Sequence, residues 1–263
     1  MNYNTFSNYF GLIANKKFPK FIQNFLNQAY VRIFDINLNE FEVPNGGFES
    51  LNQLFTRRLK IQRELGDGFI SPSDGKILEC GVGDKFKALS IKGCEYKVDE
   101  LLGESLDKDE LKNGFDYANI YLSPKDYHHY HSPCDLQIVS AYYKQGSLFS
   151  VSPKTLLKVP NLYAKNERVI LKTVLPNNKL LWIVFVGALN VGKMRFCFDN
   201  KIQTNANLGD AFYKYENLFV KKGQTLGNFE LGSTIVLISQ NGALKYDQIS
   251  NQQVKFGQNL AQI

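Results

Sequence analysis

The stretch LLWIVFVGALNVG, Leu180 to Gly192, is the longest apolar run of the chain, and it decides between a membrane-spanning and a globular fold. A helix that crosses a bilayer needs ~20 apolar residues, and this run is well short of that length. A strand buried on both faces explains the run better, because such strands are continuously apolar. We therefore expect a globular β protein.

The sequence on both sides of this run supports the same interpretation. From residue 64 onward the chain consists of short β-type runs separated by Gly, Asn, Asp and Pro. One segment, Lys97 to Gly114, is helical in character instead. We predict an α+β protein whose catalytic domain, residues 64–263, is mainly antiparallel β. The runs outside the central stretch include FISPSDGKILEC, KALSIKG, YANIYLS, LQIVSAYY, RVILKTVL and STIVLIS.

Residues 1–63 form an N-terminal region with two amphipathic helical patterns. The first pattern starts near Pro19, and the second follows the VPNGG break and is surrounded by cations. The apolar faces are Phe18, Phe21, Ile22, Phe25, Leu26 and Ala29 in the first, and Leu51, Leu54, Phe55 and Leu59 in the second, with Arg57, Arg58, Lys60 and Arg63 as the cations.

Two interpretations of this region are open. In the first, each apolar face packs on the main domain and the arginines are solvated, which the pattern alone favours. In the second, an uncovered apolar face and the cations meet an anionic membrane surface.

The composition sets broad limits. The chain has 263 residues, 44% apolar and 21% charged, which excludes disordered and fibrous classes. A net charge of +6 is compatible with an anionic partner, either nucleic acid or acidic lipid. The four cysteines (Cys80, Cys94, Cys134 and Cys197) show no C-x-x-C pair and indicate reduced thiols, and the N-terminus lacks the features of a signal peptide.

All three histidines lie in one stretch, YLSPKDYHHYHSP, Tyr121 to Pro133. In an extended segment, a period of two places His129 and His131 on one face and His128 on the other, whereas a local turn would bring His128 and His131 together. An imidazole titrates near neutrality and can take and return a proton, so these residues are candidate acids and bases. We expect no metal site, because no cysteine or carboxylate cluster completes a ligand set.

Two further stretches suggest a nucleophile triad. SPSDGKI places Asp74 in a turn before a strand, and FELGSTIVLIS places Ser233 directly after Gly232. Ser233 has no G-x-S-x-G elbow, but the carbonyl of Gly232 is a nearby electrophile, and glycine leaves that bond sterically open. Attack there converts the peptide to an ester, and elimination then leaves dehydroalanine, which hydrolyses to a pyruvoyl group.

Six blocks in order between about residues 54 and 240 resemble the pyruvoyl-dependent, prokaryotic-type phosphatidylserine decarboxylases. The last block, LGST, is short, but the joined blocks make the resemblance specific. The departures are Leu136 and Lys193, and neither is a proposed catalytic position. The blocks are SPSDGKI, IKGCEYKVDELLG, YLSPKDYHHYHSP, GSLFSVSPKTLLKVPNLYAKNERV, GALNVGKM and LGST.

The resemblance implies a role for each candidate residue. Ser233 becomes the pyruvoyl group, which forms a Schiff base with the substrate, after self-cleavage at Gly232–Ser233 into a β chain (1–232) and an α chain (233–263). His131 is the base of that cleavage and Asp74 its orienting carboxylate. His128 serves decarboxylation as a neutral-range proton donor, and His129 has no assigned role.

The same resemblance implies the function and the partners. The expected reaction converts phosphatidylserine to phosphatidylethanolamine and CO₂ in phospholipid biosynthesis. The expected location is the cytoplasmic side of the cell membrane, as a peripheral protein on an anionic surface. No nucleic acid is involved, the α and β chains stay associated, and a homodimer is compatible with the sequence.

Two other functions use the same features differently. A Ser-His-Asp hydrolase of lipid esters would keep Ser233 as a hydroxyl and leave the chain intact. A non-enzymatic β domain that docks on acidic membranes would leave Asp74 and the histidines without a purpose.

Overall fold

The computed structural model describes residues 13–83, 89–91, 93–107, 109–188, 193–206, 208–230, 233–247 and 249–263. Gly232 lies outside the described residues. The helices are α2 (Lys20–Ile33), α3 (Leu51–Phe55), α4 (Val98–Leu102), α5 (Pro153–Leu156) and α6 (Leu162–Lys165), with one 3₁₀ turn, η1 (Gly103–Ser105). The strands are β1 (Phe69–Ile70), β2 (Gly75–Gly83), β3 (Leu89–Ile91), β4 (Cys94–Tyr96), β5 (Phe115–Leu122), β6 (His129–His131), β7 (Leu136–Lys144), β8 (Arg168–Val174), β9 (Leu180–Val186), β10 (Met194–Phe196), β11 (Ala211–Val220), β12 (Thr225–Phe229), β13 (Ser233–Gln240), β14 (Lys245–Tyr246), β15 (Gln253–Val254) and β16 (Asn259–Gln262).

An eight-stranded sheet organises the β domain, in the order β11-β7-β8-β9-β13-β5-β2-β15. Its strand pairs are antiparallel, so the prediction of a mainly antiparallel β domain is confirmed. The central strands β9 and β13 are the apolar runs that the sequence analysis interpreted as buried strands. In β13, Ile235 and Leu237 enter one core cluster while Val236 and Ile238 enter another, so both faces of the sheet are covered.

The two faces have different covers. A small sheet, β10-β12-β6, lies on one face and contributes Tyr130, Phe196 and Phe229 to the core there. Short helices cover the other face, through Leu101 of α4 and Leu162 of α6 among others. Helical structure was predicted for residues 97–114, but the helical turns span only Val98 to Ser105.

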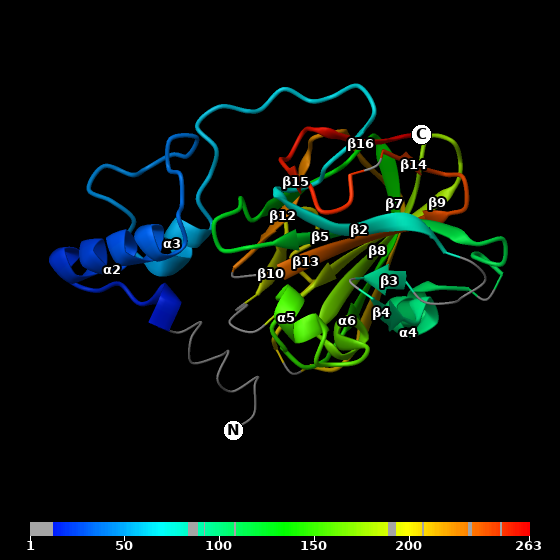
Figure 1. Ribbon diagram of the computed structural model, residues 1–263, viewed down its shortest axis with the longest axis horizontal. Coiled ribbons are helices and arrows are strands. Elements are labelled where there is room, and N and C mark those ends of the chain that lie inside the picture. Colours follow the sequence, from blue (N-terminus) through cyan, green and yellow to red (C-terminus); the bar gives the residue numbers. More distant parts are fainter. Residues whose placement is uncertain are drawn as a thin grey trace.

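Helix α2 was predicted correctly, and its apolar face is uncovered, as in the second of the two interpretations. Figure 1 shows α2 and α3 to one side of the β domain, at the left. Phe21 and Phe25 are 76% and 71% exposed, whereas Gln23 and Asn27 are buried. Asn27 Nδ2 donates to the carbonyl of Phe48 at 2.7 Å and Gln23 Nε2 donates to Asn27 Oδ1 at 2.9 Å. The apolar face therefore does not pack on the main domain, because paired amides occupy the inner side of the helix.

The second predicted helix is wrong beyond Phe55. The helix is capped at Thr56, and Phe41 and Leu59 form an isolated antiparallel bridge. Arg57 was expected on the helix surface, but it is buried, and its guanidinium donates to the carbonyls of Leu54, Lys125 and Asp126 at 3.2, 2.5 and 3.0 Å. These carbonyls replace water around the guanidinium, which makes its burial tolerable.

Within the described part of the chain, no helix combines the length and the apolar character needed to cross a membrane.

Candidate active site

One end of the large sheet collects the predicted residues. Ser233 is the first residue of β13 and pairs with Leu122 of β5, while Tyr121 of β5 pairs with Lys76 of β2. Asp74 immediately precedes β2, so it lies at the same end of the sheet, two strands from Ser233. Glycine is required at position 75, because a Cβ there would lie 2.7 Å from the Tyr121 carbonyl oxygen.

Ser233 is fully buried, and its hydroxyl has no hydrogen-bond partner among the described residues. A buried hydroxyl in this state costs about 1–3 kcal/mol. An unengaged Oγ is available as a nucleophile.

The histidines alternate along β6 as their spacing predicted. Tyr130 enters the core, while His129 and His131 line a cavity of about 580 Å³. Arg58 is the charged residue of this lining, and Thr225 and Asn228 of β12 form part of its wall. His128 does not line this cavity, so its side chain lies apart from those of His129 and His131.

His131 is held as a neutral base. Its Nδ1 lies 3.1 Å from the Gly223 carbonyl oxygen, which can only accept, so Nδ1 carries the proton. Its Nε2 therefore carries an unprotonated lone pair, which accepts a hydrogen bond from the Tyr127 hydroxyl at 3.3 Å. Burial lowers the pKa of His131 to about 4, so at neutral pH the ring is able to accept a proton.

Asp74 does not contact His131 as a direct triad would require. Its Oδ1 accepts the Phe256 backbone N–H at 2.8 Å, and its carboxylate forms a two-point ion pair with Arg63, including Nη2 to Oδ2 at 3.1 Å. Among the residues described, no hydrogen bond joins Asp74, His131 and Ser233 to one another. Asp74 and His131 are linked through Phe256, whose ring stacks on the imidazole with centroids 3.7 Å apart.

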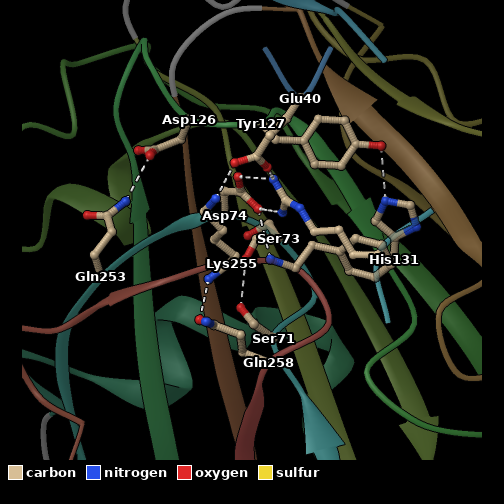
Figure 2. Close-up of polar contacts among 12 residues, drawn as sticks. Glu40, Ser71, Ser73, Asp74, Asp126, Tyr127, His131, Gln253, Lys255 and Gln258 are labelled. Atoms are coloured by element: carbon tan, nitrogen blue, oxygen red, sulfur yellow. Dashed lines mark hydrogen bonds and ion pairs between the residues drawn. The ribbon is translucent and has the colours of Figure 1, made fainter. Parts of the chain in front are cut away.

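Figure 2 shows how these residues lie. The Tyr127 hydroxyl points to the His131 ring, and Asp74 lies near Glu40 and Lys255 on the other side of Tyr127. The close-up therefore places the carboxylate and the base in one region without direct contact.

His128 is buried more deeply than a neutral-range acid would be. Its Nδ1 donates to the Asp126 carbonyl at 2.8 Å, and its ring packs on Phe55 with centroids 3.8 Å apart. Its Nε2 is buried with no hydrogen-bond partner in the described chain. Burial, reinforced by the charge of Arg57, holds the pKa of His128 well below its usual value. His128 is therefore neutral in the free site, and its role as the proton donor in decarboxylation stays a prediction.

Three residues of the site have no site role in the predictions made from the sequence. Arg57 donates to the Asp126 carbonyl, which also accepts a hydrogen bond from His128. Arg63 forms an ion pair with Asp74. Tyr127 meets the lone pair of His131. The two arginines were assigned to a surface helix by their spacing, whereas Tyr127 lies inside the histidine stretch, where its position beside the candidate bases was a usable signal.

Acid should destabilise the protein through His131. Its pKa is near 6.5 in an unfolded chain and about 4 when folded, so the unfolded state binds more protons between these values. The stabilisation is complete above pH 6.5 and is lost as the pH falls toward 4, by ~3 kcal/mol in total.

Urea unfolding of the Ser233→Ala chain between pH 7 and 4 measures this loss. Buried Asp116, Asp126 and Glu167 have raised pKa values and oppose the effect, so the comparison is with a His131→Asn version of the same chain. The two chains should differ in pH slope, and equal slopes would contradict the folded pKa of His131.

Comparisons with known proteins show the family of the chain. The family model described as phosphatidylserine decarboxylase matches residues 51–262. A phosphatidylserine decarboxylase proenzyme of Campylobacter jejuni is 59% identical over 97% of this chain and 97% of its own length. Proenzymes of the same name from Helicobacter pylori and Legionella pneumophila are 49% and 35% identical, over 98% and 95% of this chain and 97% and 91% of their own lengths. The chain belongs to the phosphatidylserine decarboxylase family.

Proposed function

We propose that this chain is a proenzyme that cuts itself between Gly232 and Ser233 and then decarboxylates phosphatidylserine to phosphatidylethanolamine and CO₂. One observation carries the proposal. The buried, unpartnered hydroxyl of Ser233 stands at the first position of β13, at the sheet end that also holds Asp74. Family membership supplies the substrate and the reaction class.

The residues fit a pyruvoyl group made from Ser233. The orphaned hydroxyl is the atom that such a conversion removes, so the change relieves an unmet hydrogen-bonding demand. The pyruvoyl group supplies an electron sink for the bond that breaks when CO₂ leaves.

Self-cleavage needs a base for the serine proton. Ser233 Oγ attacks the Gly232 carbonyl carbon, the peptide C–N bond breaks, and the acyl group moves from nitrogen to oxygen. Loss of the Ser233 Cα proton then expels residues 1–232 as a carboxylate, and water replaces the new amino group, which leaves as ammonia. We assign the base to His131, whose Nε2 lone pair is free of protons at neutral pH.

After cleavage, β13 keeps the α chain in place. The strand lies between β9 and β5 and pairs with both along its length. Its side chains belong to the cores on both faces of the sheet. The fragments 1–232 and 233–263 should therefore remain associated without a covalent bond.

His128 is the proposed proton donor for the carbon that CO₂ leaves. Its Nδ1–H is committed to the Asp126 carbonyl, so Nε2 is the atom that exchanges a proton. The neutral ring must first gain a proton, and a nearby anionic substrate favours this by raising the pKa. Substrate binding thus prepares His128 for donation.

We propose that α2 binds the membrane surface on the cytoplasmic side. Phe21, Phe25 and Ile33 are exposed apolar residues of the helix, and the cations Lys20 and Arg32 are exposed as well. Such a helix lies in the interface with its apolar face in lipid. Each cation near an anionic leaflet adds ~1 kcal/mol.

Replacement of both Phe21 and Phe25 by Asp should weaken binding to anionic vesicles by at least ~10-fold. Thermal stability should be unchanged, because both rings are exposed in the free protein. Vesicle flotation measures the binding. Phe219→Asp is the matched control, since Phe219 is 64% exposed but lies in β11. Equal flotation of the two variants would contradict the assignment to α2.

The function is tested by incubating the purified chain with vesicles of phosphatidylserine and measuring CO₂ and phosphatidylethanolamine. We expect both products in equal amounts. Release of fatty acid with no CO₂ would identify a lipid-ester hydrolase instead, and absence of all products would leave only a membrane-binding role.

A further inference from the structure

The charged groups around Asp74 form a closed cluster that reaches from the N-terminal region to the C-terminal segment. Arg63 pairs with both Asp74 and Glu40, the latter at 2.8 Å, and Lys255 also pairs with Glu40. The cluster holds two acids and two cations, so its formal charge is zero. Arg63 is its centre, with a side chain only 16% exposed.

Tyr127 connects this cluster to His131. The Arg63 guanidinium lies over the Tyr127 ring at 5.9 Å from the centroid, and the Tyr127 hydroxyl meets His131 Nε2 at 3.3 Å. The Tyr127 ring also stacks on His129 and His131, with centroids 5.0 and 5.8 Å apart. The position of the hydroxyl is therefore set by the packing of its ring between the histidines and Arg63.

We propose that Asp74 acts on His131 through Arg63 and Tyr127, which makes Arg63 and Tyr127 positioning residues for the base. This inference rests on the proposed self-cleavage. Asp74 holds the Arg63 guanidinium by a two-point ion pair, and that guanidinium packs over the Tyr127 ring. The Tyr127 hydroxyl then orients the imidazole through His131 Nε2. A direct carboxylate–imidazole bond is replaced by a chain of three contacts.

The linkage has an electrostatic consequence. Besides burial, the charges of His129 and Arg63 lower the pKa of His131, and Arg58 is a second cation in the lining of its cavity. Asp74, Tyr127 and Cys197 are the other titratable groups around the ring and its cavity. Removing the Arg63 charge leaves Asp74 unpaired and makes the surroundings of His131 more negative.

The test is a titration of the three histidines by NMR in the Ser233→Ala chain, which cannot cleave. Arg63→Gln should raise the His131 midpoint by about 0.5 to 1 pH unit. Arg63→Lys keeps the charge and should leave the midpoint in place. Arg32→Gln removes an exposed cation of α2 and is the control for a general charge effect.

Cleavage of the corresponding chains with Ser233 intact is measured in parallel, from cell-free synthesis. Tyr127→Phe removes the hydroxyl partner of His131 Nε2, and Arg63→Lys removes the two-point contact with Asp74. Each change should slow cleavage by ~10-fold or more, because the base is no longer held in position. Tyr127→Phe keeps the ring packing, so its cleavage rate tests the inference even if Arg63→Gln does not fold.

Two outcomes overturn the inference. One is an unmoved His131 midpoint in folded Arg63→Gln, and the other is wild-type cleavage in Tyr127→Phe. A parent chain with Ser233 that never cleaves would instead overturn the proposed function, and the titration in the Ser233→Ala chain would still report the contact.

Discussion

Replacement of Ser233 by alanine is expected to leave the chain in one piece and without decarboxylase activity. The loss should be at least ~10³-fold, because the change removes the attacking atom and the source of the pyruvoyl group together. The fold should tolerate it, since the hydroxyl that is lost has no hydrogen-bond partner in the described chain. Gel analysis of the purified protein and CO₂ release from phosphatidylserine vesicles measure the two effects.

Ser239 provides a matched control in the same strand. It is also fully buried, and its hydroxyl is also unpartnered among described residues, but it lies near the other end of β13. Ser239→Ala should cleave and decarboxylate as the wild type does. Loss of cleavage in both variants would point to damage to the strand rather than to a missing nucleophile.

The histidines should separate the two reactions. His131→Ala should abolish cleavage, whereas His128→Ala should cleave and then release CO₂ ~10²–10⁴ times more slowly, the usual range for a lost general acid or base. The two effects should separate because the two side chains lie in different places. His131 lines the cavity, whereas His128 is buried against Phe55. Cleavage assays and single-turnover CO₂ release distinguish the two steps.

His128→Asn guards against a packing defect, because asparagine fills part of the space and can still donate to the Asp126 carbonyl. It should also cleave without efficient decarboxylation. If His128→Ala and His131→Ala both cleave normally, the base has been assigned to the wrong residue.

Local patterns predicted the β domain well. The runs at Leu180 and Ser233 became β9 and β13, because burial on both faces of a sheet demands continuous apolar sequence. The period of two correctly placed His129 and His131 on one face. These features depend only on neighbours within a few residues, which a sequence displays directly.

The N-terminal region shows where local patterns fail. Gln23 and Asn27 face inward because Asn27 binds the carbonyl of Phe48, and Arg57 is buried because it binds carbonyls of Lys125 and Asp126. The contact of Arg63 with Asp74 similarly turns an expected surface cation into part of the site. Each of these partners lies outside the helical pattern that was used for the prediction, so spacing could not reveal them.

Self-cleavage makes Ser233 the first residue of a new chain, and the mass of the purified protein tests this step. We predict two associated fragments, one ending at residue 232 and one starting at residue 233, with the second lighter by one ammonia than simple hydrolysis would give and blocked to amine-directed sequencing. A single intact chain that releases CO₂ from phosphatidylserine would contradict the account.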